Sequence, residues 1–115
     1  MATVDSPPKT LVTGEAAPRP DGKNLWIKID VGTATFHCGP VERVGTGKNR
    51  HVTFHPDTPC KLYFSNFEVF QTNEKQLVKG DNDLPVLDKT NGVETRCSLD
   101  GAGTEKMGPP VIVVP

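Results

Sequence analysis

Three histidines and three cysteines are the side chains of this chain best suited to metal or nucleophilic chemistry. His51 and His55 stand four residues apart in an alternating segment, so both point to one face of the expected strand. Imidazole and thiolate groups are common zinc and copper ligands, but two strand residues at this spacing lie about 13 Å apart, too far to bind one ion. We therefore expect no metal site. If one is present, its ligands come from His37, His51, His55, Cys60 and Cys97.

Nucleophilic catalysis requires a serine or cysteine beside a general base. Cys38 follows His37, but adjacent residues of a strand face opposite sides of the sheet. Ser65 and Ser98 lack the glycine-flanked motif that exposes a nucleophilic serine at a sharp turn. Buried, inert thiols are the simpler interpretation of the cysteines. We predict that the protein is not an enzyme and uses no cofactor.

Two short motifs resemble ligand-binding loops but lack essential members. Residues 45–48 read Gly-Thr-Gly-Lys, like the end of a phosphate-binding loop, yet the earlier glycine is missing and Asn49 replaces the required Ser or Thr. Residues 81–83 read Asp-Asn-Asp, like the start of a calcium loop, yet Pro85 occupies the place of the next oxygen ligand and no bidentate glutamate follows. The first motif predicts a hairpin loop and the second a plain turn.

The candidates for partner binding are two aromatic and two basic side chains. Trp26 lies among the polar residues of its alternating strand, and if it is exposed beside Tyr63 it provides an anchor for a partner or a sugar. The alternative for Trp26 is packing at an edge of the fold or under the N-terminal tail. Lys48 and Arg50 form a basic cluster with His51, although three such residues also suit a solvated loop. The expected partner-binding residues are Trp26, Tyr63, Lys48 and Arg50.

Length and charge restrict the classes of function. The 115 residues and 12.4 kDa fit a single domain. Thirteen Lys and Arg against fourteen Asp and Glu give a net charge of −1, which provides no field to attract phosphate backbones or anionic lipid. We expect neither nucleic acid nor membrane as a partner. No signal-peptide pattern is present and the odd number of cysteines suits a reducing compartment, so we expect a soluble cytoplasmic protein, or a secreted one if a leader has been removed.

The segments that position these residues have the pattern of short β-strands. Residues 1–23 contain four prolines and one pair of large aliphatic residues, so we expect a disordered tail there. In residues 24–115 apolar and polar side chains alternate with a period of two, and no segment has a helical period. The expected strands are 24–31, 33–38 continuing past Gly39-Pro40 as a bent strand to 41–44, 51–55, 60–65, 77–78, 84–87, 93–99 and 111–114.

For two of these strands the sequence also predicts the place within a sheet. Pro85 cannot donate a hydrogen bond to a sheet, so it predicts that residues 84–87 form an edge strand or a bulge. The unbroken apolar run of residues 111–114 predicts a strand that is central or covered on both faces. Seven or eight short strands, antiparallel or mixed, predict an all-β sandwich for residues 24–115.

The order of motifs along residues 24–115 resembles that of the cupredoxin-like and immunoglobulin-like β-sandwiches. The resemblance comes from the turn at residues 80–83, the Asn-Gly pair that precedes the strand ending near Cys97, and the Gly-Pro-Pro approach to residues 111–114. A blue-copper protein of this kind would bind its metal through Cys97, Met107 and nearby histidines, but the last histidine is His55. An antibody-type domain would pair Cys38 with Cys97, but no tryptophan stands between them.

These observations together predict a non-enzymatic binding or assembly module built on a β-sandwich. The alternative that the resemblance implies is a copper-binding or electron-transfer protein of the cupredoxin-like type. We expect the partner to be a protein, and an edge strand would give the sandwich a route to homo-oligomers.

Overall fold

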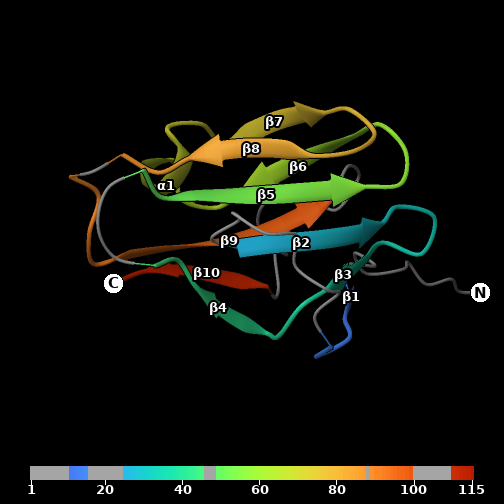
Figure 1. Ribbon diagram of the computed structural model, residues 1–115, viewed down its shortest axis with the longest axis horizontal. Helices are drawn as coiled ribbons and strands as arrows, with labels where there is room; N and C mark the ends of the chain where they lie inside the picture. Colours follow the sequence, from blue (N-terminus) through green and yellow to red (C-terminus); the bar gives the residue numbers. More distant parts are fainter. Residues whose placement is uncertain (1–10, 16–24, 46–48, 88, 100–109) are drawn as a thin grey trace, which may run out of the picture.

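Two β-sheets face each other in the computed structural model, which describes residues 11–15, 25–45, 49–87, 89–99 and 110–115. Sheet A has the strand order β1 (Leu11–Val12), β3 (Thr35–His37), β2 (Leu25–Asp30), β5 (His51–Pro56) and β8 (Asn82–Pro85). Sheet B has the order β4 (Val41–Arg43), β10 (Val111–Val114), β9 (Val93–Leu99), β6 (Cys60–Phe64) and β7 (Glu74–Leu77). In Figure 1, β2, β5 and β8 lie in front of β9, β6 and β7. The prediction of an all-β sandwich is confirmed.

Both sheets are mixed. In sheet A, β1 pairs with β3 and β2 with β5 in parallel, while β2–β3 and β5–β8 are antiparallel. In sheet B, β4 and β10 are parallel and the other pairs are antiparallel. Between β2 and β5 the chain passes through β4 of sheet B, and between β4 and β10 it passes through β5 and β8 of sheet A, so strands that are distant in sequence become neighbours.

Alternation along each strand decides which side chains fill the space between the sheets. In β2, Leu25, Ile27 and Ile29 are buried, whereas the intervening residues face outward. The same alternation in β6 buries Leu62 and Phe64. The buried apolar side chains form one core cluster that both sheets share, which is the arrangement that period-two patterns predict for a sandwich.

Residues 33–44 form two strands rather than the single bent strand expected from the sequence. β3 belongs to sheet A and β4 to sheet B. The Gly39-Pro40 break between them is the point where the chain crosses from one sheet to the other. A sequence pattern shows that pairing stops at such a break, but it does not show that the next strand joins another sheet.

The expectation that no segment is helical is wrong for residues 67–70. They form the one-turn helix α1 (Phe67–Phe70), whose N-cap Asn66 accepts a hydrogen bond from the backbone N–H of Glu68. Gln71 ends the helix in the left-handed conformation, with φ of 63°. A four-residue helix is too short to produce a detectable helical period. It buries Phe70 against Phe64, with ring centroids 4.7 Å apart.

Part of the segment expected to be a disordered tail belongs to sheet A. β1 pairs in parallel with β3, and beyond it the N–H groups of Thr13 and Gly14 donate to the carbonyls of Phe36 and Cys38. The remainder of the expected tail lies outside the described residues. Because of β1 and the division of residues 33–44, the described residues form ten strands instead of the expected seven or eight.

The two positional predictions are confirmed in sheet order. β8, which ends at Pro85, is an edge strand of sheet A. β10 lies between β4 and β9 inside sheet B, with Ile112 and Val114 fully buried and Val111 and Val113 half-buried. Because β8 is an edge strand, the missing N–H of Pro85 breaks no pairing with a further strand. In contrast, β10 pairs with a strand on each side.

Candidate functional site

The outer face of sheet A carries most of the polar side chains that the sequence suggested for chemistry. The register of β3, β2 and β5 places His37, Lys28 and His55 in one row. Trp26 lies one row away on β2, beside Thr53 of β5. The expectation that Trp26 shares the polar face of its strand is confirmed, since the apolar residues on either side of it are buried.

Trp26, His55 and Asp81 form a connected group, here called the Trp26 cluster. Oδ1 of Asp81 accepts a hydrogen bond from Nε1 of Trp26 at 2.9 Å and lies 2.7 Å from Nδ1 of His55. The two rings are tilted, with centroids 5.0 Å apart. Beside the cluster, the hydroxyl of Thr53 donates to the carboxylate of Asp83. Asp81 and Asp83 flank the start of β8, so these contacts tie β8 to β5 and β2.

His55 and Asp81 are arranged like the histidine and the carboxylate of a catalytic triad. A carboxylate on Nδ1 orients an imidazole so that Nε2 points away from it, as in hydrolases. The serines with described positions, Ser65 and Ser98, belong to the region of β6 and to β9 of sheet B, and the three cysteines are buried. The cluster therefore fixes side chains on the surface of sheet A, and no described serine or cysteine lies there to pair with His55 as a nucleophile.

The five candidate metal ligands lie in different layers of the sandwich. His37, His51 and His55 face outward from sheet A, whereas Cys60 and Cys97 are buried on the inner face of sheet B. No group of three potential metal ligands occurs among the residues that the structure describes. The described histidines and cysteines therefore do not fit the copper site that a cupredoxin resemblance implies, and Met107 lies outside the described residues.

The thiols of Cys38 and Cys97 are held in their protonated form. Burial raises the pKa of the Cys38 thiol to about 12, and the negative charge of Glu42 adds to the shift. Burial also raises the pKa of Cys97, with a smaller contribution from Cys38. Thiolates, not thiols, are the nucleophiles and metal ligands, so both side chains are inert core residues at neutral pH. This agrees with the interpretation of the cysteines from the sequence.

A copper titration tests this interpretation. Adding Cu(II) to the reduced protein is expected to give no intense visible absorption, because a thiolate and the histidines do not meet at one point. The matched control is the Cys97→Ser variant, which should give the same spectrum as the wild type. An intense blue band in the wild type that is lost in Cys97→Ser would contradict the separation of the ligands.

The remaining candidate partner-binding residues are not brought together with Trp26. Tyr63 faces outward from β6 of sheet B, opposite Glu74 and Ser98, on the other side of the sandwich. Arg50 is only 3% exposed, and its guanidinium donates to the carbonyls of Leu87 and Thr90 at 2.8 Å. Arg50 thus anchors the loop after β8 from inside, and its side chain is not on the surface. Lys48 lies outside the described residues.

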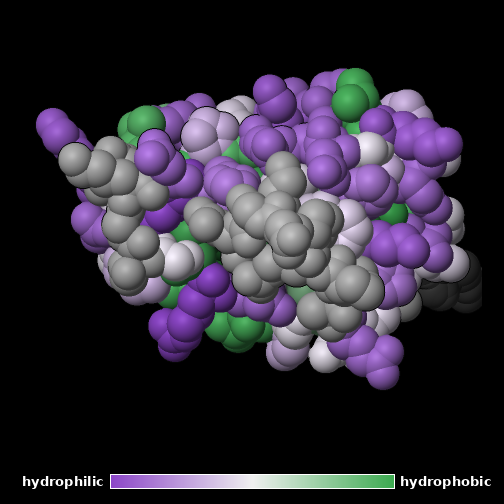
Figure 2. Space-filling view, in the orientation of Figure 1, coloured by the Kyte–Doolittle hydropathy of each residue, from purple (hydrophilic) through white to green (hydrophobic). Residues whose placement is uncertain are grey.

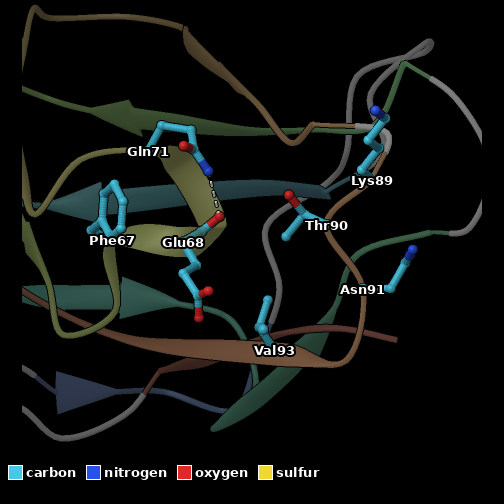
Figure 3. A pocket seen from close by; sticks show the side chains of 7 residues that line it. All are labelled: Phe67, Glu68, Gln71, Lys89, Thr90, Asn91 and Val93. Atoms are coloured by element: carbon cyan, nitrogen blue, oxygen red, sulfur yellow. Dashed lines mark hydrogen bonds between the residues drawn. The ribbon is translucent and has the colours of Figure 1, made fainter.

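A shallow pocket of about 260 Å³ opens between α1 and the loop before β9. Figure 3 shows α1 residues on one side of it and loop residues on the other, with the amide of Gln71 bonded to the carbonyl of Glu68. Its lining offers one carboxylate and one amine, but no histidine, cysteine or serine. The lining residues are Phe67, Glu68, Gln71, Lys89, Thr90, Asn91 and Val93. The pocket contains no catalytic set.

The edge of sheet B at β4 was not predicted from the sequence. The N–H of Val111 donates to Pro40 and the N–H of Val44 donates to Val113, so alternate residues of this segment bond to β10. In a parallel pair the residues between them direct their backbone groups away from the partner strand. Val41 and Arg43 therefore present their N–H and C=O groups at the edge of sheet B, where no other described strand pairs with them.

An apolar strip borders this edge on the outer face of sheet B. Val41 is 54% exposed and lies beside the half-buried Val111, and Arg43 lies beside the half-buried Val113. Figure 2 shows hydrophobic side chains reaching the surface along the border where Figure 1 places β4 and β10. The only sequence signal for the edge was the Gly39-Pro40 break before Val41.

Side chains and a proline protect parts of the edges at β7 and β8. The hydroxyl of Thr72 donates to the carbonyl of Glu74 and accepts from its N–H, so both backbone groups of that β7 residue are capped. The side chain of Asn82 bonds both backbone groups of Val78, between β7 and β8, and β8 ends at a proline. Capped groups and prolines are common protections of sheet edges. β1, the other edge of sheet A, has two residues.

No helix in the described part of the chain is long and apolar enough to cross a membrane. Comparisons with known protein families, with curated proteins and with solved structures find no match for this chain.

Proposed function

We propose that the protein is a non-enzymatic binding module that takes up an extended segment of another protein as an additional strand beside β4. In this recognition mode the backbone hydrogen bonds of the edge provide affinity, and the side chains of alternate residues provide specificity. The observation that carries the proposal is the contrast between edges. No described strand pairs with the outer backbone groups of β4, which lie beside the exposed Val41, whereas β7 is capped at Glu74 and β8 ends at Pro85, which has no N–H.

The sheet pairing favours a cupredoxin-like over an immunoglobulin-like scaffold for this module. Immunoglobulin sandwiches consist of antiparallel sheets, whereas β2 pairs with β5 and β4 with β10 in parallel here. The parallel β4–β10 pair also creates the open edge, because it makes the three-residue strand β4 the last described strand of sheet B. The metal chemistry of blue-copper proteins is not part of the proposal, since the histidines and cysteines lie in different layers.

Replacing Val41 by proline tests the proposal. Proline removes the edge N–H of residue 41 without removing a bond between β4 and β10, so the free energy of unfolding should change by less than about 1 kcal/mol. Binding of protein partners captured from a native extract should fall at least about tenfold, because the added strand loses backbone hydrogen bonds at the centre of its contact. The matched control Val41→Thr keeps the N–H and the β-branched shape and should retain most binding.

A second surface variant separates this proposal from binding through sheet A. Trp26→Ala removes the aromatic residue that the sequence singled out as an anchor, and it leaves β4 intact. We expect partner capture to persist in Trp26→Ala, and the amides of residues 41 and 43 to exchange more slowly in the complex. Capture that is lost in Trp26→Ala and kept in Val41→Pro would place the binding surface on sheet A instead.

A further inference from the structure

The inner side of the β4 edge carries the carboxylate of Glu42, which has no cationic partner among the described residues. Glu42 stands opposite Ile112, a fully buried residue, so its side chain leaves β4 on the side of the core. Its Oε2 accepts the backbone N–H of Gly39 at 2.6 Å. In the described part of the chain no lysine or arginine forms an ion pair with it. A half-buried carboxylate at an open edge favours a neighbouring positive charge.

The outer side of the edge has a different chemistry. Val41 and Arg43 share this face with Val111 and Val113. A residue added opposite Val41 would extend the apolar strip, and a residue added opposite Arg43 would meet its guanidinium. Opposite charges and β-branched pairs across neighbouring strands each stabilise a sheet, while like charges directly opposite destabilise it.

A second copy of the chain fits this edge poorly. If two β4 strands paired antiparallel about a two-fold axis, residues 41 and 43 would bond to their counterparts and the two Glu42 side chains would stand opposite each other. In an antiparallel ladder, opposite residues that share no hydrogen bond have their side chains closer together than hydrogen-bonded pairs do. The two Glu42 residues would form such a pair, so their carboxylates would repel at short range. Inward-pointing charges on edge strands are a known protection against self-association.

We infer that the strand accepted beside β4 carries a lysine or arginine opposite Glu42, a β-branched apolar residue opposite Val41 and an acidic residue opposite Arg43. In antiparallel pairing, that segment has the order acidic, basic, apolar along its own chain. This inference rests on the proposed function and adds the chemistry of the partner. The backbone of β4 provides the bonds that any strand can use, and Glu42 selects among strands by charge.

The experiment uses isotopically labelled full-length protein and short capped peptides, followed by proton–nitrogen NMR. The first peptide has Asp-Lys-Val at its centre between threonines, and the second has glutamate in place of the lysine. The first should shift the amides of residues 41 and 43, and the second should bind about tenfold more weakly. Glu42→Lys should reverse this preference, and Glu42→Gln, which keeps an acceptor for Gly39, should weaken the lysine peptide roughly fivefold.

The outcomes separate this inference from the proposed function. Equal binding of both peptides, with shifts at residues 41 and 43, would overturn the charge selection and leave strand addition standing. Absence of any shift at those amides with either peptide would overturn strand addition itself. A concentration-dependent dimer in sedimentation that is abolished by Val41→Pro would overturn the choice of partner, since a second copy would then occupy the edge.

Discussion

Deletion of residues 108–115 is expected to unfold the protein, because it removes β10 from the interior of sheet B. The two buried side chains of that strand, Ile112 and Val114, contribute roughly 1.5–3 kcal/mol each through their burial. The deletion also breaks the pairing of β4 and exposes one edge of β9. A typical domain is stable by only about 5–15 kcal/mol, so the lost burial and the lost strand pairing together are comparable to the whole free energy of unfolding. Amide dispersion in a proton–nitrogen NMR spectrum should collapse.

Two single substitutions in the same strand provide a matched comparison. Ile112→Asp places a carboxylate among core side chains and should unfold the domain. Val113→Asp places the same carboxylate on the outer face, where Val113 is half-buried, and should leave a folded protein. A truncated chain that keeps native amide dispersion would show that β10 is an appendage and that sheet B is stable without it.

Phe64→Ala is expected to lower the free energy of unfolding by about 3–5 kcal/mol, the usual effect of removing a buried aromatic side chain. Phe64 is fully buried and packs against Phe54 and Phe70, with centroids at 6.2 and 4.7 Å. These three rings join β5 of sheet A, β6 of sheet B and α1, so the substitution loosens both sheets at once. Chemical denaturation monitored by circular dichroism gives the measurement.

Phe67→Ala serves as the control, since it has the same chemistry and lies in the same part of the chain. Phe67 is 51% exposed at the start of α1, so its removal should change the free energy of unfolding by less than about 1 kcal/mol. Similar losses for the two variants would mean that the aromatic cluster is not the centre of the core.

Local patterns were sufficient to predict most of the strands and their buried faces. The alternation in residues 25–30 and 93–99 is a direct consequence of side chains pointing to opposite faces of a strand, so it can be read without knowing the neighbours. Pro85 marked an edge for the same kind of local reason, the absence of an N–H. The pairing of Leu11 and Val12 with β3 was not predicted, since a two-residue strand has no period to detect.

The places of the candidate functional side chains in the fold could not be predicted from the pattern of any single segment. Arg50 stands in a basic sequence cluster, but the loop that follows β8 folds over it and accepts its hydrogen bonds. Trp26 and Tyr63 both face outward from their strands, yet their strands belong to opposite sheets. Outward direction is a local property, whereas the choice of sheet depends on how the chain crosses between layers.

The amino-acid sequence by itself therefore determined that this protein is an all-β sandwich, which side chains fill most of its core, and that its cysteines are buried. These properties follow from periodicity and from the free energy of burying apolar groups, both of which act within a few residues. Only the tertiary structure decided that Asp81 joins Trp26 and His55, that the histidines lie a layer away from the cysteines, and that β4 is the last described strand of sheet B. Those features arise from pairing between strands that are far apart in sequence, whose register is fixed only when both sheets close around one core.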